Sequence, residues 1–394
     1  MALGKAIQGD VVNAQPALAS PPRTAFSVVA QTWGEMDAVR AFNDRMRAAH
    51  ATSDCLLPDQ PNNSHTLSMP PRAIDWTKFV AVDNDDEVRG GFLLMTQPGW
   101  LNGELVSVAN YQGPLSEGVV DPRYGMVGMH MLGYVQKHWP LTFAVGMGGA
   151  DRPLSRLLEA AGWQLRPVPF LFHVVQASRV LRELRVLQQR PAVRLAARAG
   201  ARTGVGAIGA AALQHRAWTS SFGARDLRLE RIERWDDWAD VLWERTRESA
   251  SFSVVRDRAT LECLYPLDDP KYFAYLLYKR AEIAGWAVAL DTQMHEHSYF
   301  GNLRVATLLD VMALPEVAAP FVSQLRRQLA AGGADLIVTN QSHERWLGAF
   351  RRAGFLSGPS NYLLAMSPPL SRAIGDQTDR VHITRGDGDG RVHL

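Results

Sequence analysis

The sequence predicts an α/β protein that contains two copies of one domain, each a mixed sheet flanked by helices. An apolar strand, a helix and an Ala-Gly-aromatic ending occur together twice, at 141–163 and at 336–355. A second pair of similar segments, 78–92 and 271–286, repeats at the same offset of about 192 to 195 residues. The chain has 394 residues and 46% hydrophobic positions, which is enough to form two separate cores.

The first half of the chain alternates strand-like and helix-like segments. An apolar run at 26–30 predicts a strand, and apolar residues at helical spacing over 35–50 predict an amphipathic helix. Turn residues at 83–87 separate two apolar runs, which is typical of a β-hairpin. The further predicted elements are a strand at 105–109, a helix at 127–137, a strand at 141–145, a helix ending at Gly162 and a strand at 170–175.

The second half follows the same order of elements. Its predicted elements are a strand at 227–230, a helix at 235–246, paired strands within 272–290, a strand at 306–311, a helix at 317–331, a strand at 336–339, a helix at 344–353 and a strand at 362–366. The expected divisions are a disordered leader over 1–24, a first domain over 25–175, a basic helical linker over 176–225, a second domain over 226–370 and a flexible tail over 371–394.

Composition narrows the class of protein. The formal net charge is +2, so no strong overall field favours DNA. No stretch approaches the roughly 18 apolar residues of a membrane span. Cys55 and Cys263 are the only cysteines, which predicts a reducing compartment and a soluble, cytoplasmic protein. The His-x-His of residues 295–297 has the spacing of an exposed loop, and no metal site is expected.

A candidate anion-binding segment joins a predicted strand to an apolar-faced helix at 120–132. The start of a helix presents unpaired backbone N–H groups and the positive end of a dipole. Small residues such as Gly125 and Gly128 let a phosphate approach the main chain. The candidate cofactor-binding residues are Tyr124, Gly125, Met126, Val127, Gly128, Met129 and His130.

In this context the chain resembles the GNAT superfamily of acyl-CoA-dependent N-acyltransferases, over about 26–175 and 227–366. The family's loop reads Val-x-Pro-x-Tyr, followed by Arg/Gln-x-x-Gly-x-Gly/Ala. The matching residues are Val120, Pro122, Tyr124 and Gly128, while Gly125 and His130 replace the first and last positions of the second motif. The resemblance implies two mostly antiparallel sheets and acetyl-CoA or another acyl-CoA as co-substrate. The corresponding segment 313–320 has no glycine, so the first half is expected to bind the cofactor.

The chemistry of such a family sets requirements for the site. A neutral amine attacks the thioester carbonyl, backbone N–H groups stabilise the oxyanion, and an acid protonates the thiolate. Many family members use a Tyr four residues before the Gly-aromatic pair, but Leu158 and Phe350 occupy those positions here. Glu104 and Glu117 are candidate bases near the candidate anion-binding segment, and a water chain is an equal alternative. Tyr111 is a candidate acid.

The function expected from these features is acyl transfer to an amine. An amino sugar, a small amine and a cell-envelope precursor remain alternative acceptors, and the acyl group and oligomeric state stay open. Fem-like aminoacyl transferases, which use aminoacyl-tRNA, have a related tandem arrangement, but this chain lacks their helical-hairpin insertion. A third alternative is a degenerate, non-catalytic binding or scaffold protein, since the motif tyrosine is missing from both halves.

Overall fold

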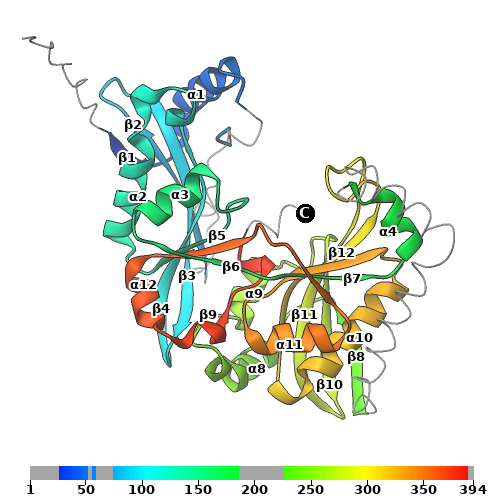
Figure 1. Ribbon diagram of the computed structural model, residues 1–394. Helices are drawn as coiled ribbons and strands as arrows, with labels where there is room; N and C mark the ends of the chain where they lie inside the picture. The colour runs from blue at the N-terminus through cyan, green and yellow to red at the C-terminus, as the bar shows by residue number, and fades with distance from the viewer. Residues whose placement is uncertain (1–25, 52–55, 59–73, 186–225, 389–394) are drawn as a thin grey trace, which may run out of the picture.

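The computed structural model describes residues 26–51, 56–58, 74–185 and 226–388. The predicted leader and most of the predicted linker lie outside these residues. Within the described part of the chain, two mixed sheets form two lobes with helices packed on them, which confirms the predicted fold class (Figure 1).

The first sheet has seven strands in one path, with two further strands paired beside β3. In spatial order they are β1 (Ser27–Ala30), β2 (Asp75–Val82), β3 (Val88–Leu101), β4 (Glu104–Ser116), β5 (Thr142–Gly146), β15 (Leu363–Met366) and β6 (Gln164–Pro167). The two additional strands are β9 (Phe252–Val254), which pairs with β3, and β16 (Val381–His382), which pairs with β9.

The second sheet repeats this order of strands. In the corresponding direction its strands are β8 (Leu227–Ile232), β10 (Tyr272–Lys279), β11 (Glu282–Gln293), β12 (Arg304–Ala313), β13 (Leu336–Asn340), β7 (Phe170–Val174) and β14 (Leu356–Gly358). In both sheets the first four strands are antiparallel, and the fifth is parallel to the fourth. The order of elements therefore confirms the resemblance to the GNAT superfamily at the level of the fold.

Helices flank both sheets. The longer helices are α1 (Met36–Ala48), α2 (Val127–His138), α3 (Pro153–Ala160), α8 (Trp238–Thr246), α10 (Ala318–Ala331) and α11 (Glu344–Arg352). The shorter ones are α4 (Ala177–Glu183), α9 (Arg258–Leu264) and α12 (Pro368–Ile374). In each half one of the longer helices follows the fourth strand and another follows the fifth, α2 and α3 in the first half and α10 and α11 in the second. The predicted linker begins as a helix, α4.

The two halves exchange their closing strands. β7 belongs to the first half by sequence but pairs with β13 of the second sheet, while β15 of the second half pairs with β5 and β6. The strands predicted at 170–175 and 362–366 are therefore present, but each pairs in the sheet of the other half and not in its own. Pro167 and Pro169 favour an extended backbone where a hairpin would have to turn back, so the chain continues from β6 into the other lobe.

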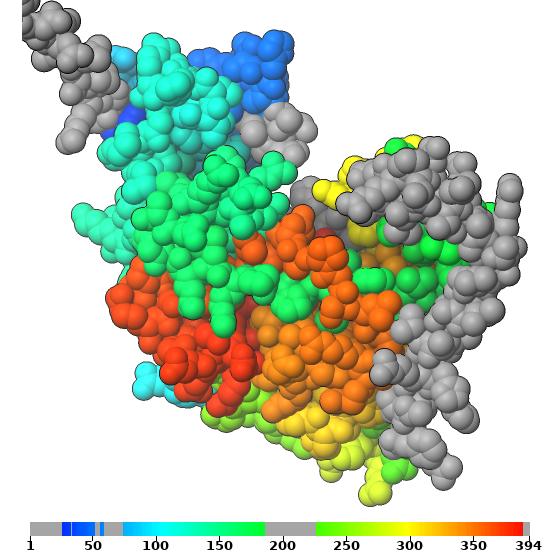
Figure 2. Space-filling model, viewed as in Figure 1, coloured from blue at the N-terminus to red at the C-terminus, as the bar shows by residue number. Residues whose placement is uncertain are grey.

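The exchange gives the two lobes a shared interior. Phe143 of β5 and Phe252 of β9 pack edge to face, with ring centroids 5.8 Å apart. The core of the second sheet includes four buried residues of the first half: Ile74, Met95, Trp100 and Leu171. In the space-filling view the orange and red C-terminal segments lie directly on the green and cyan first half (Figure 2). The divisions at 25–175 and 226–370 thus separate the halves along the sequence but not in space.

The C-terminal segment is structured, and the prediction of a flexible tail over 371–394 is wrong for residues 371–388. This stretch contains the end of α12, strand β16 and two 3₁₀ turns. Asp387 lies in one of these turns, is 1% exposed, and forms an ion pair with the buried Arg256 at 2.6 Å. The alternating Gly and Asp residues of this segment suggest flexibility in the sequence. In the structure, Gly386 and Gly388 let the backbone pass through a crowded interior.

Candidate functional site

The first sheet opens between β4 and β5. These strands pair in parallel at only two positions, Ala109 with Thr142 and Asn110 with Phe143. Beyond them β5 pairs with β15 as far as Gly146, while β4 runs on to Ser116. The edge of β4 that faces β5 is therefore free over 111–116, so it presents backbone donors and acceptors to the opening.

A β-bulge interrupts β4 beside this opening. The register between β3 and β4 shifts where Gly91 pairs with Leu115 and Leu93 pairs with Gln112. Gly113 lies within the shift and has φ +51°, and no atom lies within 4 Å of the position that a Cβ would take. Bulges turn backbone groups away from the ladder. The bulge at Gly113 thus leaves open space at the centre of the free edge.

At its far end β4 is followed by two 3₁₀ turns, Glu117–Val119 and Pro122–Tyr124, and then by α2. No side chain caps the helix at Met126, and the first bond of the helix runs from the His130 N–H to the Met126 carbonyl at 3.0 Å. The N–H groups of the first turn, Val127 to Met129, are those a helix leaves without an internal acceptor. The Met126 and Met129 side chains are 58% and 41% exposed, so this turn lies at the surface.

The predicted cofactor-binding residues form one continuous segment at this helix start. A Cβ on Gly128 would have Leu157 as its nearest neighbour, at 3.4 Å, so the backbone there is lightly covered. Tyr124 lies under the guanidinium of Arg89, 4.2 Å from the ring centroid. His130 is exposed, but its Nδ1 contacts the Met126 carbonyl at 3.0 Å, within its own helix. Only Nε2 of His130 is therefore available to a ligand.

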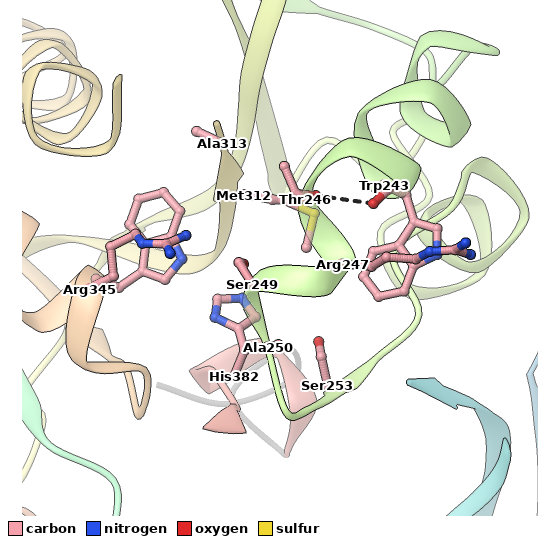
Figure 3. A pocket seen from close by; sticks show the side chains of 11 residues that line it. Trp243, Thr246, Arg247, Ser249, Ala250, Ser253, Met312, Ala313, Arg345 and His382 are labelled. Carbon is pink, nitrogen blue, oxygen red and sulfur yellow. Dashed lines mark hydrogen bonds between the residues drawn. The ribbon is translucent and has the colours of Figure 1, made fainter. Parts of the chain in front are cut away.

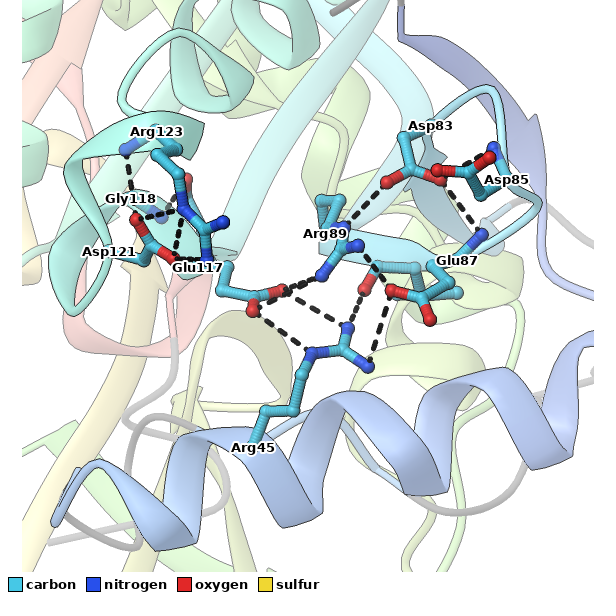
Figure 4. A network of polar contacts seen from close by, with 11 residues as sticks. Arg45, Asp83, Asp85, Glu87, Arg89, Glu117, Gly118, Asp121 and Arg123 are labelled. Carbon is cyan, nitrogen blue, oxygen red and sulfur yellow. Dashed lines mark hydrogen bonds and ion pairs between the residues drawn. The ribbon is translucent and has the colours of Figure 1, made fainter.

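Glu117 lies just before this segment and is held in a network of ion pairs (Figure 4). Its carboxylate accepts hydrogen bonds from Arg45 Nε of α1 at 3.0 Å and from Arg89 Nη1 of β3 at 3.2 Å. Arg89 also donates to Asp83 at 2.7 Å in the β2–β3 turn, and this bond holds the pKa of Asp83 below its usual value although burial alone raises it. Glu117 is 4% exposed, and both of its oxygens are engaged. This geometry suits a structural brace for the segment 120–132 better than a free base.

The three predicted catalytic residues do not converge. Glu104 is exposed at the β3–β4 turn, at the opposite end of β4 from Glu117. Tyr111 is 1% exposed and packs edge to face on Phe92 with ring centroids 5.1 Å apart. Burial raises the pKa of the Tyr111 hydroxyl far above its usual value, and the hydroxyl has no hydrogen-bond partner. Tyr111 is thus a core aromatic residue on the helix-covered face of the sheet.

Sequence reasoning missed polar residues on the opposite face of β4. Asn110 and Gln112 alternate with Tyr111 and point toward the second lobe. Asn110 Nδ2 donates to the Asp387 carbonyl at 2.6 Å, while Asn110 Oδ1 and Gln112 Nε2 are buried and have no hydrogen-bond partner in the part of the chain that the structure describes. Alternation along the strand could have indicated this polar face, but only the fold reveals that the C-terminal segment reaches it.

The second sheet has a similar opening, but the C-terminal segment fills it. β12 and β13 pair in parallel at three positions only, beginning at Val305 and Leu336. Thr384 bridges to Gln341 just beyond β13, and a Cβ on Gly386 would lie 2.0 Å from the Tyr265 hydroxyl. No side chain therefore fits at that point of the second opening.

A buried charge cluster fixes the C-terminal segment there. Arg256 is fully buried and donates to Asp310 and to Asp387, at 2.6 Å each. Tyr265 donates to the same Asp310 oxygen at 3.0 Å. Burial raises the pKa of Asp310. Burial lowers the pKa of Arg256, but the two carboxylates raise it by more, so the pKa of Arg256 lies above its usual value. The cluster satisfies the buried guanidinium and does not leave a free acid at the surface.

Two general properties of the described residues bear on the class of site. Among these residues, no group of three His, Cys, Asp or Glu side chains is arranged to hold a metal ion. None of the helices in the described part of the chain is long and apolar enough to cross a membrane.

Comparisons with known proteins agree with this picture only at low similarity. No protein-family model matches the sequence, and no curated protein does so either. Among solved structures the chain is similar to a probable N-acyltransferase of Enterococcus faecalis, with a TM-score of 0.47, 10% identity, and coverage of 88% of this chain and 74% of that one.

Two further solved structures are similar to the chain at the same low level. A tandem GNAT protein from the clavulanic acid biosynthesis pathway has a TM-score of 0.43 and 11% identity, covering 88% of this chain and 99% of its own. N-myristoyltransferase of Saccharomyces cerevisiae, solved with myristoyl-CoA and inhibitors, has a TM-score of 0.45 and 10% identity, covering 87% and 79%. Because these TM-scores are below 0.5, the assignment of the fold depends on the strand order of the chain itself.

Proposed function

We propose that the protein transfers an acyl group from an acyl-CoA to an amine, and that the first lobe binds the CoA. The observation that supports this most is the free edge of β4, which carries the bulge at Gly113 and leads into the uncapped start of α2. A free strand edge can pair with an extended amide chain, and an uncapped helix start can bind a diphosphate. CoA carries both of these groups: its pantetheine arm contains amides, and the arm is joined to a diphosphate. The two groups follow one another in the same order as the strand edge and the helix start.

The reaction follows from the position of the bulge. With the diphosphate at the N–H groups of 127–129 and the pantetheine amides along 111–116, the thioester would lie near Gly113. A backbone N–H of the bulge would stabilise the oxyanion that forms when the amine attacks the carbonyl carbon. The C–S bond then breaks, the acyl group remains on nitrogen, and the thiolate takes up a proton. We assign removal of the amine proton to water, because Glu117 is held by two arginines and Glu104 lies at the far end of β4.

The acceptor is proposed to be an amine carried by a small molecule, such as an amino sugar, or by a cell-envelope precursor. It would approach from the polar face of β4, where Asn110 and Gln112 point toward the second lobe. Buried polar atoms without partners, here Asn110 Oδ1 and Gln112 Nε2, are suited to hydrogen-bond an acceptor. This face is shared between the lobes, so both would contribute to acceptor binding.

Titration calorimetry with acetyl-CoA tests the proposal. Gly128→Glu adds a negative charge in the first turn of α2. The helix dipole favours a negative charge there, but that charge repels a bound diphosphate. We expect at least tenfold weaker binding, or about 1.4 kcal/mol. Gly133→Glu is the matched control, because residue 133 lies on the same helix, is exposed, and has no atom within 4 Å of a Cβ.

The outcomes separate the proposed function from its alternatives. Free thiol released from acetyl-CoA in the presence of one amine of a panel supports the transferase. This release should be reduced by Gly128→Glu and not by the control Gly133→Glu. Binding of aminoacyl-tRNA without any response to acetyl-CoA would favour a Fem-like enzyme. No response to either ligand would favour a non-catalytic binding protein and would overturn the proposal.

A further inference from the structure

A small pocket remains at the wide end of the second opening (Figure 3). It lies between the last residues of β12, the start of α11, the turn after α8 and strand β16. Its volume is about 20 Å³, which is room for one or two water-sized groups. Its lining includes Met312, Trp346, Ser249, Arg345 and His382. No acidic side chain lines it, so the ionisable groups that face the pocket are basic.

His382 is the most unusual residue of the pocket. It is 4% exposed, and its Nε2 has no hydrogen-bond partner among the described residues; Asp310 Oδ1 lies 3.9 Å away, too far for a hydrogen bond. A buried polar atom of this kind, on a residue that lines a pocket, indicates a missing ligand.

Arg345 reaches into the same space from the first turn of α11 (Figure 3). Its side chain is half-buried, and it forms no ion pair with any carboxylate in the described part of the chain. Burial and the neighbouring Arg380 together lower the pKa of Arg345. A partly buried guanidinium without a counter-ion is costly unless a ligand supplies one. Arg247 also lines the pocket, but its guanidinium stacks on Trp100 at 4.3 Å and points elsewhere.

The groups that face His382 make the pocket electropositive. Burial, His343, Arg256 and Arg345 all lower the pKa of His382. Asp310 is the one acidic group beside it, and its oxygens already accept hydrogen bonds from Arg256, Tyr265 and the Val311 N–H. His343 is itself engaged, through Nε2 with the Ser249 carbonyl at 3.1 Å and through Nδ1 with the Arg345 N–H at 3.1 Å. The free donor capacity thus belongs to Arg345 and, once protonated, to His382.

We propose that this pocket binds one small oxyanion, a carboxylate or phosphate group, between Arg345 and His382. The guanidinium donates to one oxygen, and His382 takes up a proton on Nε2 and donates to another. The volume admits one or two oxygen atoms of an acidic group, whether that group is free or ends a larger molecule, and not a nucleotide. The site lies in the second lobe and goes beyond the proposed acyl transfer, since it involves neither α2 nor β4.

Titration calorimetry of the full chain with inorganic phosphate and, separately, with acetate tests the proposal and distinguishes the two sources of an oxyanion. Arg345→Gln is expected to weaken binding of the preferred anion at least tenfold. Arg351→Gln is the matched control, since Arg351 lies on the same helix, pairs with Glu344 and is half-exposed. Both titrations are carried out in the Gly128→Glu background, so that an anion bound at the proposed diphosphate site of α2 does not contribute.

The pH dependence gives a second readout that a general loss of folding would not produce. With His382 intact, affinity should rise as the pH falls, because burial holds the pKa of His382 low in the free protein and binding takes up one proton on its ring. His382→Gln should bind more weakly and without this pH dependence. Absence of binding of both anions at millimolar concentration, or equal losses in Arg345→Gln and Arg351→Gln, would overturn the proposal.

Discussion

The two openings of the molecule have the same origin in the sheet but different contents. Between β4 and β5 the free strand edge carries a bulge at Gly113 with open space around it. Between β12 and β13 the equivalent space holds the C-terminal segment, where Gly386 leaves no room for a side chain beside Tyr265. The two halves thus share one strand arrangement with two openings, and the chain itself fills one of them, which supports the proposal that the other binds the ligand.

The helix starts differ less than the openings do. Neither α2 nor α10 has an acidic residue in its first turn or a side chain that caps it. The difference is in the glycines, since Gly125 and Gly128 lie at the start of α2 while the corresponding segment 313–320 has none. This supports the proposal that the cofactor binds at α2 and not at α10.

The largest expected effect tests how firmly the second opening is sealed. Arg256→Met would leave Asp310 and Asp387 buried without their counter-ion. We expect the free energy of unfolding to fall by about 3–5 kcal/mol, as measured by urea denaturation. Arg258→Met removes surface ion pairs two residues away and should change stability little. Equal, small effects of both substitutions would mean that the cluster does not hold the C-terminal segment.

A smaller effect is expected at the brace of the first lobe. Glu117→Gln weakens the hydrogen bonds from Arg45 and Arg89 and should cost about 1.5–3 kcal/mol of stability. Because Glu117 is assigned a structural role, the pH profile of acyl transfer should keep its shape while affinity for acetyl-CoA falls. Glu104→Gln, at the exposed end of β4, should change neither property. A lost ionisation in the pH profile of Glu117→Gln would restore Glu117 as the base.

Alanine substitutions compare the space in the two openings. Gly386→Ala places a methyl group 2.0 Å from the Tyr265 hydroxyl and should destabilise the protein by about 1–3 kcal/mol through overpacking. Gly113→Ala meets no atom and should cost about 1 kcal/mol, from its positive φ alone. Unfolding midpoints in urea provide the measurement. A larger cost at Gly113 than at Gly386 would contradict the difference between the openings.

The smallest expected effect concerns the exchanged strand β7. His173 donates from Nδ1 to the Gly354 carbonyl at 3.0 Å and accepts from Arg326 at 3.3 Å, and burial lowers its pKa. Below about pH 6.5 the unfolded chain therefore binds the proton first, so His173 contributes stability above this pH that is lost as the pH falls. His173→Gln should flatten the acid side of the stability curve by at most about 1.4 kcal/mol per pH unit. An unchanged slope would show that His173 is protonated in the native state.

Sequence reasoning reached the fold class because it depends on local patterns, while anion binding at 120–132 stays a prediction. The repeated Ala-Gly-aromatic endings and the strand before Val127 are visible in the letters. The exchange of β7 and β15 depends on where strands pair over long distances, and Pro167 and Pro169 were the only local signs of it. The structured C-terminus was missed because the segment around Asp387 has the Gly- and Asp-rich composition of a flexible end. Its buried partner, Arg256, is distant in the sequence and is brought beside it only by the fold.

The candidate catalytic residues were less predictable for a related reason. Glu117 lies close to the segment 120–132 in the sequence, but its partners Arg45 and Arg89 come from α1 and β3. Tyr111 and Asn110 are neighbours in the chain, yet they point to opposite faces of one strand. Which face is the core and which is the shared interior follows from the packing of the second lobe, which no local pattern contains.

A crystal structure of the protein with CoA tests the central claim most directly. The account predicts that the diphosphate lies within hydrogen-bond distance of the N–H groups of residues 127–129, and that the pantetheine arm follows β4 past Gly113. Density for CoA at the start of α10, or along β12 with the segment around Gly386 displaced, would contradict it.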